Sequence, residues 1–336
     1  TQIVFTGAAD DKITVTSSSG QSSIYSGAGD DDVRLSLTGN ATSLVEAGAG
    51  EDLIAVTSTT TNTDTKVYGW GAAGEAGDLN HLMRSDGDDI MSGGTGVESF
   101  FGQYGKDILS GGLGADYING GVGDDILSGG VLELRNAATN ALIDLQAANA
   151  METIQVRMIA EVTIGDGDGA DTVEGGYGSD VLLGGDGGDT LRGGGSADIL
   201  VGDYGKISVS TNRIAETFIS TGMTSAGGQD ILDGGAGGDI LVGGGSVNVT
   251  DTETLTDTKG NNIIFGDFGI AEGSRILEIV TAFRSIQSAF GTQDIITTGT
   301  GNDVIIGGEQ SDTITGGLGG DVVIADSGSF VPSERT

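Results

Sequence analysis

The sequence has no cysteine, a single proline and few aromatic residues (5%). Without cysteine it cannot form a disulfide framework or a zinc–thiolate site. Positive charge is also scarce, since 14 Lys and Arg stand against 49 Asp and Glu, a formal net charge of −35. Nucleic-acid binding needs clustered Lys and Arg, so we expect no nucleic-acid partner and look to cations instead. No apolar run reaches the ~18 residues of a transmembrane helix, so we expect no membrane insertion.

Glycine, in contrast, is abundant (64 residues), and hydrophobic residues (37%) are spread evenly. This much like charge and glycine usually leaves a chain disordered, because too little apolar surface can be buried to offset the ordering entropy. Internal repetition resolves the conflict. From residue 85 the chain falls into units of nine that resemble G-G-x-G-x-D-x-U-x, where U is a large apolar residue. The acidic sixth position is occupied by Asp89, Glu98, Asp107, Asp116, Asp125, Asp171, Asp180, Asp189, Asp198, Asp230, Asp239, Asp294, Asp303, Asp312 and Asp321.

The N-terminal part is looser, with Asp11, Asp31 and Asp52 roughly 20 residues apart in similar acidic loops. Residues 1–84 therefore indicate degenerate coils of about 20 residues, with an irregular loop at 66–84. Nonapeptide blocks are predicted at 85–130, 166–205, 225–245 and 289–328, and inserts at 131–165, 206–224 and 246–288, the last with a degenerate repeat near 257–269. The sequence starts and stops within this pattern, so we expect a segment of a longer tandem array.

Each nonapeptide predicts a glycine turn followed by a three-residue strand, because glycine adopts backbone angles that side chains forbid. Two nonapeptides make one coil, and coils stack as parallel strands that bury one aliphatic column. The predicted fold is therefore an all-β parallel β-roll, a solenoid with β-rich inserts. Alternation at 154–164 favours strands or hairpins that flank or cap the roll. For residues 136–152 a short helix is the alternative to a strand or hairpin. Residues 276–290 fit either a strand or a helix.

A carboxylate on a glycine loop every nine residues is typical of a calcium site, because calcium takes six to eight oxygen ligands from carboxylates and backbone carbonyls. Stacking brings acids that are two repeats apart close together, and without an ion they would repel. The pairs expected to share an ion are Asp89/Asp107, Asp107/Asp125, Asp171/Asp189, Asp180/Asp198, Asp294/Asp312, Asp303/Asp321 and Glu98/Asp116.

These uninterrupted nonapeptides resemble the RTX (repeats-in-toxin) family of hemolysin-type calcium-binding proteins. The resemblance implies one ion between two stacked loops, with a sixth-position carboxylate from each. It also implies carbonyl ligands from positions two and four of one loop, here Ser85, Gly87, Gly94, Gly96, Gln103, Gly105, Gly112, Gly114, Gly167, Gly169, Gly176, Gly178, Gly185, Gly187, Gly235, Gly237, Gly299 and Gly301. Positions one and three of the next loop supply the others, here Gly102, Tyr104, Gly111, Leu113, Gly120, Val122, Gly129, Val131, Gly184, Asp186, Gly193, Gly195, Gly202, Tyr204, Gly307, Glu309, Gly316 and Leu318.

Some positions depart from the pattern. Glu98 is longer than aspartate, and Asn248 and Asn262 place a neutral side chain at the sixth position, so weak or empty sites are expected there. His81 is the only histidine and has no HExxH context, so we assign it no catalytic role. Tyr68 and Trp70 in the same glycine-rich loop favour local packing over a contact site.

The repeats follow one another without a recognisable set of catalytic residues. This favours a structural, non-enzymatic protein of the extracellular space or bacterial cell surface. A surface layer, sheath, filament or adhesin stalk fits, with self-association through the roll ends and the inserts. The alternatives are a ligand-binding adhesin or toxin region whose inserts hold a host or surface ligand, and a calcium-triggered folding module of a secreted enzyme. The family resemblance further implies type I secretion.

Overall fold

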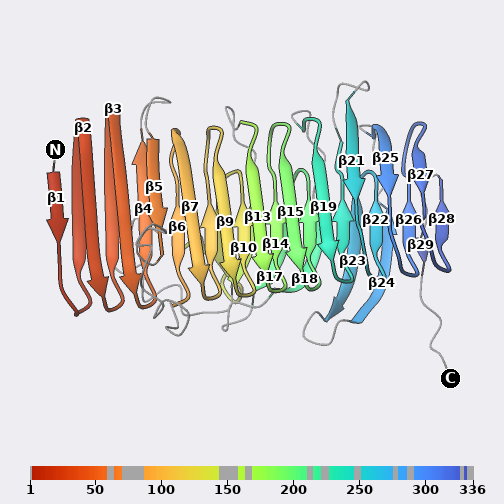
Figure 1. Ribbon diagram of the computed structural model, residues 1–336, viewed down its shortest axis with the longest axis horizontal. Coiled ribbons are helices and arrows are strands. Elements are labelled where there is room, and N and C mark those ends of the chain that lie inside the picture. Colours follow the sequence, from red (N-terminus) through yellow and green to blue (C-terminus); the bar gives the residue numbers. More distant parts are fainter. Residues whose placement is uncertain are drawn as a thin grey trace.

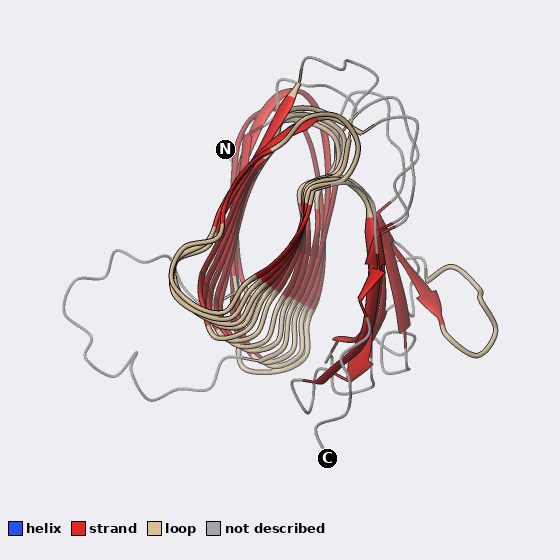
Figure 2. Ribbon diagram, turned by 90° about the vertical axis from the view of Figure 1, so that its right-hand side faces the viewer, coloured by secondary structure: helices blue, strands red, loops and turns tan. Residues whose placement is uncertain are grey.

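A computed structural model describes residues 2–58, 64–69, 87–143, 158–162, 169–209, 215–220, 227–245, 251–274, 279–285, 291–325 and 329–330. Twenty-two strands form one parallel sheet that winds as a roll from the N-terminal to the C-terminal part (Figure 1). A second, antiparallel sheet of seven strands lies beside it (Figure 2). The described residues contain no helix. The predicted all-β parallel roll with β-rich inserts is confirmed.

The roll has two legs, and each coil contributes one strand to each leg. Leg one contains β4 (Leu53–Ser58), β6 (Ile90–Ser92), β8 (Ile108–Ser110), β10 (Ile126–Ser128), β14 (Val181–Leu183), β16 (Ile199–Val201), β20 (Ile240–Val242), β22 (Ile263–Phe265), β26 (Val304–Ile306) and β28 (Val322–Ile324). Leg two contains β1 (Gln2–Phe5), β5 (Asp64–Tyr68), β7 (Val97–Tyr104), β9 (Tyr117–Val122), β13 (Thr172–Tyr177), β15 (Thr190–Gly195), β19 (Ile231–Ala236), β21 (Thr252–Thr256), β25 (Gln293–Thr297) and β27 (Thr313–Thr315). The long strands β2 (Lys12–Ala28) and β3 (Asp32–Ala49) pass through both legs.

The strand register follows the repeat length. Ile126 pairs with Ile108, and Thr190 pairs with Thr172, so one coil within a block is two nonapeptides. In the N-terminal coils Ile13 pairs with Val33 and Val33 with Ile54, which matches the wider spacing of the acids there.

The interior of the roll is one aliphatic column. The predicted apolar positions Leu109, Ile118, Leu127, Leu182, Leu191 and Leu200 are all 0% exposed and belong to this cluster. Fully burying such a side chain stabilises the fold by about 1.5–3 kcal/mol. The N-terminal coils bury more, since β3 alone contributes Val33, Leu35, Leu37 and Val45 to the column. In the nonapeptide coils the column is one residue wide on each leg, so each of these coils gains little from burial alone.

The inserts build the antiparallel sheet. Its order is β11 (Leu132–Asn136), β12 (Met158–Val162), β17 (Gly205–Val209), β18 (Ala215–Ser220), β23 (Gly269–Ser274), β24 (Ile279–Ser285) and β29 (Ser329–Phe330). The segments that supply its first six strands all leave the roll in turns that lead from leg one to leg two, so they emerge along the same edge and pair with one another. Leu132 N–H donates to Ser110 Oγ at 3.0 Å, which fixes the first insert to β8.

The two legs differ on their outer faces. In leg one the residue directly before the interior position is also apolar, and Ile108, Ile126 and Val181 are buried in a second cluster with Leu132 and Leu134 of β11. In leg two the corresponding residues are mostly polar, as in Thr172 and Glu174, and the apolar Ile231 and Ile295 are 49% and 45% exposed. The insert sheet therefore covers leg one and leaves leg two facing outward (Figure 2).

The two ambiguous segments can be compared with the described residues. No helix is formed between residues 136 and 143, where Asn136 ends β11 and a turn follows. Of residues 276–290, the stretch Ile279–Ser285 is a strand. Trp70 and His81 lie outside the described residues, as do Ser85, Gly167 and Asn248. The proposed boundaries of blocks and inserts stay a prediction.

Candidate metal centres

The sixth-position side chains lie in two ladders along the roll, one in each row of turns. Ladder one precedes the leg-one strands and comprises Asp11, Asp31, Asp52, Asp89, Asp107, Asp125, Asp180, Asp198, Asp239, Asn262, Asp303 and Asp321. Ladder two precedes the leg-two strands and comprises Glu98, Asp116, Asp171, Asp189, Asp230, Glu253, Asp294 and Asp312.

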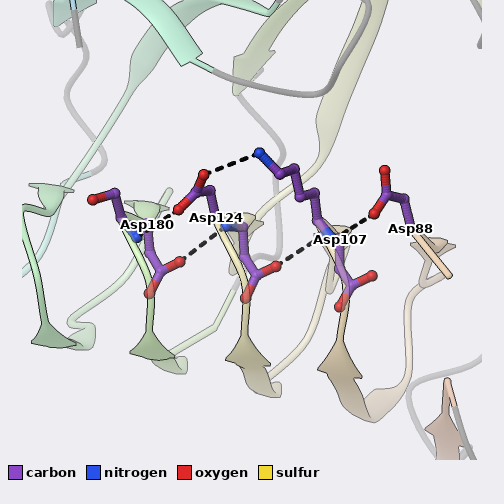
Figure 3. Close-up of polar contacts among 7 residues, drawn as sticks. Asp88, Asp107, Asp124 and Asp180 are labelled. Carbon is purple, nitrogen blue, oxygen red and sulfur yellow. Dashed lines mark hydrogen bonds and ion pairs between the residues drawn. The ribbon is translucent and has the colours of Figure 1, made fainter. Parts of the chain in front are cut away.

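One contact repeats at each step of a ladder. The backbone N–H of an acid donates to a side-chain oxygen of the acid in the next coil, as from Asp107 to Asp125 Oδ1 at 2.9 Å (Figure 3). A parallel set joins the fifth positions, where Lys106 N–H donates to Asp88 Oδ1 at 2.9 Å and Lys106 Nζ contacts Asp124 at 3.1 Å. Stacking thus uses one oxygen of each ladder carboxylate and leaves the other directed into the turn.

The ladders continue across the inserts. Asp116 N–H donates to Asp171 Oδ1 at 2.6 Å and Asp189 N–H to Asp230 Oδ1 at 2.8 Å, although 55 and 41 residues separate these pairs. The sequence interpretation paired acids only within a block and missed these pairs. An insert enlarges a turn without changing the stacking of the coils, so the spatial spacing stays constant while the sequence spacing does not.

The second carboxylate oxygens are buried. For several ladder acids this oxygen has no hydrogen-bond donor among the described residues: Asp31, Asp52, Asp116, Asp125, Asp230, Glu253, Asp294 and Asp303. An isolated buried carboxylate is costly unless a cation or donor compensates it. Among the described residues no three acidic or histidine side chains converge on one point, so backbone carbonyls would supply most ligands, which suits calcium.

A carbonyl oxygen lies beside these carboxylate oxygens. A Cβ added at Gly102 would lie 2.2 Å from Asp107 Oδ2 and 2.7 Å from the Gly120 carbonyl oxygen of the next coil. At Gly111 the corresponding distances are 2.4 Å to Asp116 Oδ2 and 2.5 Å to the Gly129 carbonyl oxygen. Each such pair of oxygens is within about 5 Å, the separation open to two ligands of one calcium ion at 2.3–2.6 Å. We name this space, bounded by the first glycine of a loop, the loop cradle.

Other predicted carbonyl ligands also hydrogen bond between coils. The Val122 carbonyl accepts Gly105 N–H at 3.0 Å, and the Gly184 carbonyl accepts Gly130 N–H at 2.9 Å. A carbonyl oxygen has a second lone pair, so these bonds are compatible with a metal ligand. The donor set of buried carboxylates and close carbonyls fits calcium. Which carbonyls coordinate it stays a prediction.

Burial raises the pKa of the ladder acids. It raises the pKa of Asp52 and Asp116 to about 7. Burial and then the nearby Asp180 raise the pKa of Asp125 to about 8. Burial and then Asp230 raise the pKa of Glu253 to about 10. These raised values mean that the roll by itself disfavours the charged carboxylates, and a bound cation would reverse this preference.

In the N-terminal coils ladder two continues with hydroxyl side chains. Ser22 pairs in register with Ser43, Ser43 with Thr65, and Thr65 with Glu98. All three hydroxyl residues are buried. The acidic loop is therefore replaced there by uncharged side chains, so in these coils only ladder one offers carboxylates for calcium.

Sequence reasoning missed several buried acids. Glu253, and not Asn248, stands in ladder two, because Asp230 N–H donates to Glu253 Oε2 and Glu253 pairs in register with Asp294. Asp203 and Asp267, the acids of two G-D-x-G strings, are 2% and 3% exposed. The available signal was that an aromatic form of this string recurs, as GDYG at 202–205 and GDFG at 266–269.

Each of these two aspartates lies where the chain leaves the roll to form an insert, Asp203 before β17 and Asp267 before β23. Gly202 begins a loop that Asp230 completes after the insert, since a Cβ at Gly202 would lie 2.2 Å from Asp230 Oδ2. Asp203 Oδ2 accepts Gly245 N–H of the next coil at 2.7 Å. In ladder two Asp230 stands next to Asp189, whose N–H donates to Asp230 Oδ1 at 2.8 Å.

The family comparison agrees with this geometry. The model of the RTX calcium-binding nonapeptide repeat matches residues 101–131, 166–205, 225–249, 247–269 and 289–323. The repeats belong to the RTX family. RTX nonapeptide repeats bind calcium at multiple sites, so the two ladders mark calcium-binding turns. A search of curated proteins found no match to this sequence.

RTX repeat proteins are typically exported by type I secretion. The RTX β-roll is a structural fold and not a known enzyme fold. In the part of the chain that the structure describes, no helix is long and apolar enough to cross a membrane.

Proposed function

We propose that this chain is a calcium-stabilised structural segment of an extracellular protein, such as a surface layer, sheath, filament or adhesin stalk. The supporting observation is that the acid ladders continue through the inserted turns, as from Asp125 to Asp180. A roll stabilised turn by turn in this way can be lengthened without a larger core. We further propose that it is exported unfolded by type I secretion and folds where calcium is plentiful, and that it has no catalytic role.

We propose self-association as the way the segment works. Exposed apolar side chains within the roll support it, since Tyr177 and Ile231 of leg two are 75% and 49% exposed. The insert sheet also presents an edge strand, β29, which among the described residues pairs only with β24. Edge strands can pair with another chain.

The test is assembly as a function of calcium. Purified protein should be unfolded and monomeric in chelator, and should fold and then assemble into filaments or sheets visible by electron microscopy when calcium is added. Assembly of equal extent in excess chelator would contradict the proposal. Calcium-dependent folding without assembly would leave the calcium-binding assignment intact and reject the assembly role.

One observation favours a second candidate, a ligand-binding adhesin region. The inserts emerge along one edge and join in a single sheet (Figure 2), which would give them a common surface. Replacing the insert at 206–224 by a short glycine-serine linker should then abolish binding in a glycan or cell-surface screen while the calcium-dependent circular dichroism is retained.

A further inference from the structure

The degenerate repeat at residues 257–262 reads D-T-K-G-N-N. Asp257 replaces the glycine of the first position, and Asn262 replaces the acid of the sixth position. Taken alone, the second change would weaken a calcium site, because it removes one of the two charges that a site between stacked loops carries. Both changes lie in the same loop. Both side chains face the preceding coil, which contains Gly234 and Asp239.

Asn262 preserves the geometry of ladder one and loses only its charge. Asp239 N–H donates to Asn262 Oδ1 at 2.9 Å, and Asn262 N–H donates to Asp303 Oδ1 at 2.9 Å. Asn262 is 1% exposed, and its Nδ2 donates to the Gly260 carbonyl at 3.3 Å. The amide therefore satisfies the stacking contacts without supplying a carboxylate to the loop cradle below it.

Asp257 is directed into that cradle. It is 3% exposed, and its carboxylate lies within hydrogen-bonding reach of the Asp239 carboxylate. A Cβ added at Gly234 would lie 2.3 Å from Asp257 Oδ2 and 2.8 Å from Asp239 Oδ2. In the preceding coil of the same ladder, the equivalent point at Gly193 lies 2.5 Å from Asp198 Oδ2 and 2.7 Å from the Gly234 carbonyl oxygen. The Asp257 carboxylate thus approaches the cradle on the side where the other loops present a carbonyl.

We propose that Asp239 and Asp257 together bind a calcium ion in the loop cradle at Gly234, with Asp257 restoring the negative charge that Asn262 lacks. Two carboxylates that face the same buried space repel each other unless a cation lies between them. With both, the site carries the charge of two carboxylates, the same as a site with acids at both sixth positions. This inference concerns one site and is independent of the proposed assembly.

A purely structural role for Asp257 makes a different prediction. Its Oδ1 accepts Lys259 N–H at 2.9 Å, a local turn that asparagine forms equally well. Asp257→Asn therefore keeps the turn and removes only the charge. The double variant Asp257→Gly with Asn262→Asp restores the usual repeat, with glycine first and acid sixth.

The experiment counts calcium bound to the purified full chain by equilibrium dialysis with mass-spectrometric calcium analysis, at calcium concentrations up to saturation. It also follows calcium-dependent protection of residues 231–242 by hydrogen exchange. Asp257→Asn should bind one ion fewer and lose protection in that segment, and the double variant should recover both. The control Asp30→Asn, an exposed carboxylate outside the two ladders, should match the unmodified chain.

Two outcomes would overturn the proposal. One is Asp257→Asn with the same calcium count and the same protection of residues 231–242 as the unmodified chain. The other is a lost ion that the double variant fails to restore although its circular dichroism shows a folded roll. Either result would leave calcium binding by the remaining ladder acids unaffected.

Discussion

Asp125 and Asp180 are 55 residues apart in the sequence, yet they occupy adjacent coils, where Asp125 N–H donates to Asp180 Oδ1 at 2.9 Å. A complete insert lies between them in the chain. The contact is the same as the one between Asp107 and Asp125, which are two repeats apart (Figure 3). The position of an acid in its turn, and not its distance along the chain, decides its partner.

Asp180→Asn should remove a calcium site as effectively as a substitution within an uninterrupted block. The substitution keeps the acceptor oxygen and removes the charge. If calcium is about 100-fold above its dissociation constant, losing one ion lowers the free energy of unfolding by about 3 kcal/mol. Calcium-titrated thermal unfolding measures this. Asp124→Asn, a fifth-position acid that is 40% exposed, is the control and should change stability by less than about 1 kcal/mol.

Gly178→Ala should destabilise the roll strongly, because Gly178 has φ +136° and an added Cβ would lie 1.6 Å from the Gly123 carbonyl oxygen. The backbone must shift to relieve that overlap, at a cost of at least about 2 kcal/mol. Gly195→Ala is the matched control, since the nearest atom to its added Cβ is 3.8 Å away. Chemical denaturation in saturating calcium compares the two variants, and equal stability would show that the stacking of turns is looser than described.

Asp267→Ala should weaken the attachment of the roll to the insert that follows this residue. Asp267 Oδ1 accepts Thr292 N–H at 2.9 Å and Oδ2 accepts Glu309 N–H, so one carboxylate joins the returning chain and the next coil. We expect faster hydrogen exchange at Thr292 and Glu309 and faster proteolysis between residues 268 and 290, with the N-terminal coils unchanged. Unchanged exchange at both amides would show that this attachment is held by other contacts.

The metal-free protein should gain structure on mild acidification. Burial raises the pKa of Asp116 to about 7 and, with Asp180, that of Asp125 to about 8, above the ~4 of an unfolded aspartate. The folded state therefore binds more protons than the unfolded state, so stability rises as pH falls through the folded pKa values and is lost again as pH rises.

With calcium present the trend should reverse, because protons compete with calcium for the same oxygens. Circular dichroism between about pH 9 and about pH 5, with chelator and with calcium, tests both directions. A chelated sample that loses β-structure as pH falls over this range would contradict the burial of these carboxylates.

Much of the repeat geometry could be predicted from the sequence. The glycine loop, the acid and the aliphatic residue recur at fixed spacing, and Leu109, Leu127 and Leu182 all lie in the interior column as expected. The sequence also contains a pattern that distinguishes the two legs and that the sequence interpretation did not use. An apolar residue directly before the interior position recurs in every second repeat, as at Ile108 and Val181, and it marks the leg that the insert sheet covers.

Other features depend on three-dimensional closure. The partner of Asp116 could not be read from spacing, because the intervening insert has no fixed length. Asn248 fits the nonapeptide count better than Glu253, yet Glu253 is the residue in register with Asp294. Asp257 breaks the glycine consensus, so a motif reading treats it as degeneration when it supplies a buried carboxylate.

The most direct test is far-ultraviolet circular dichroism of the full chain, first stripped of all divalent cations at neutral pH and then titrated with calcium. In the nonapeptide coils, a one-residue-wide aliphatic column and buried like charges predict little β-structure without the ion. We expect a cooperative gain of the β-sheet signal with calcium. A full β-sheet signal in the stripped protein, unchanged by calcium, would contradict the account.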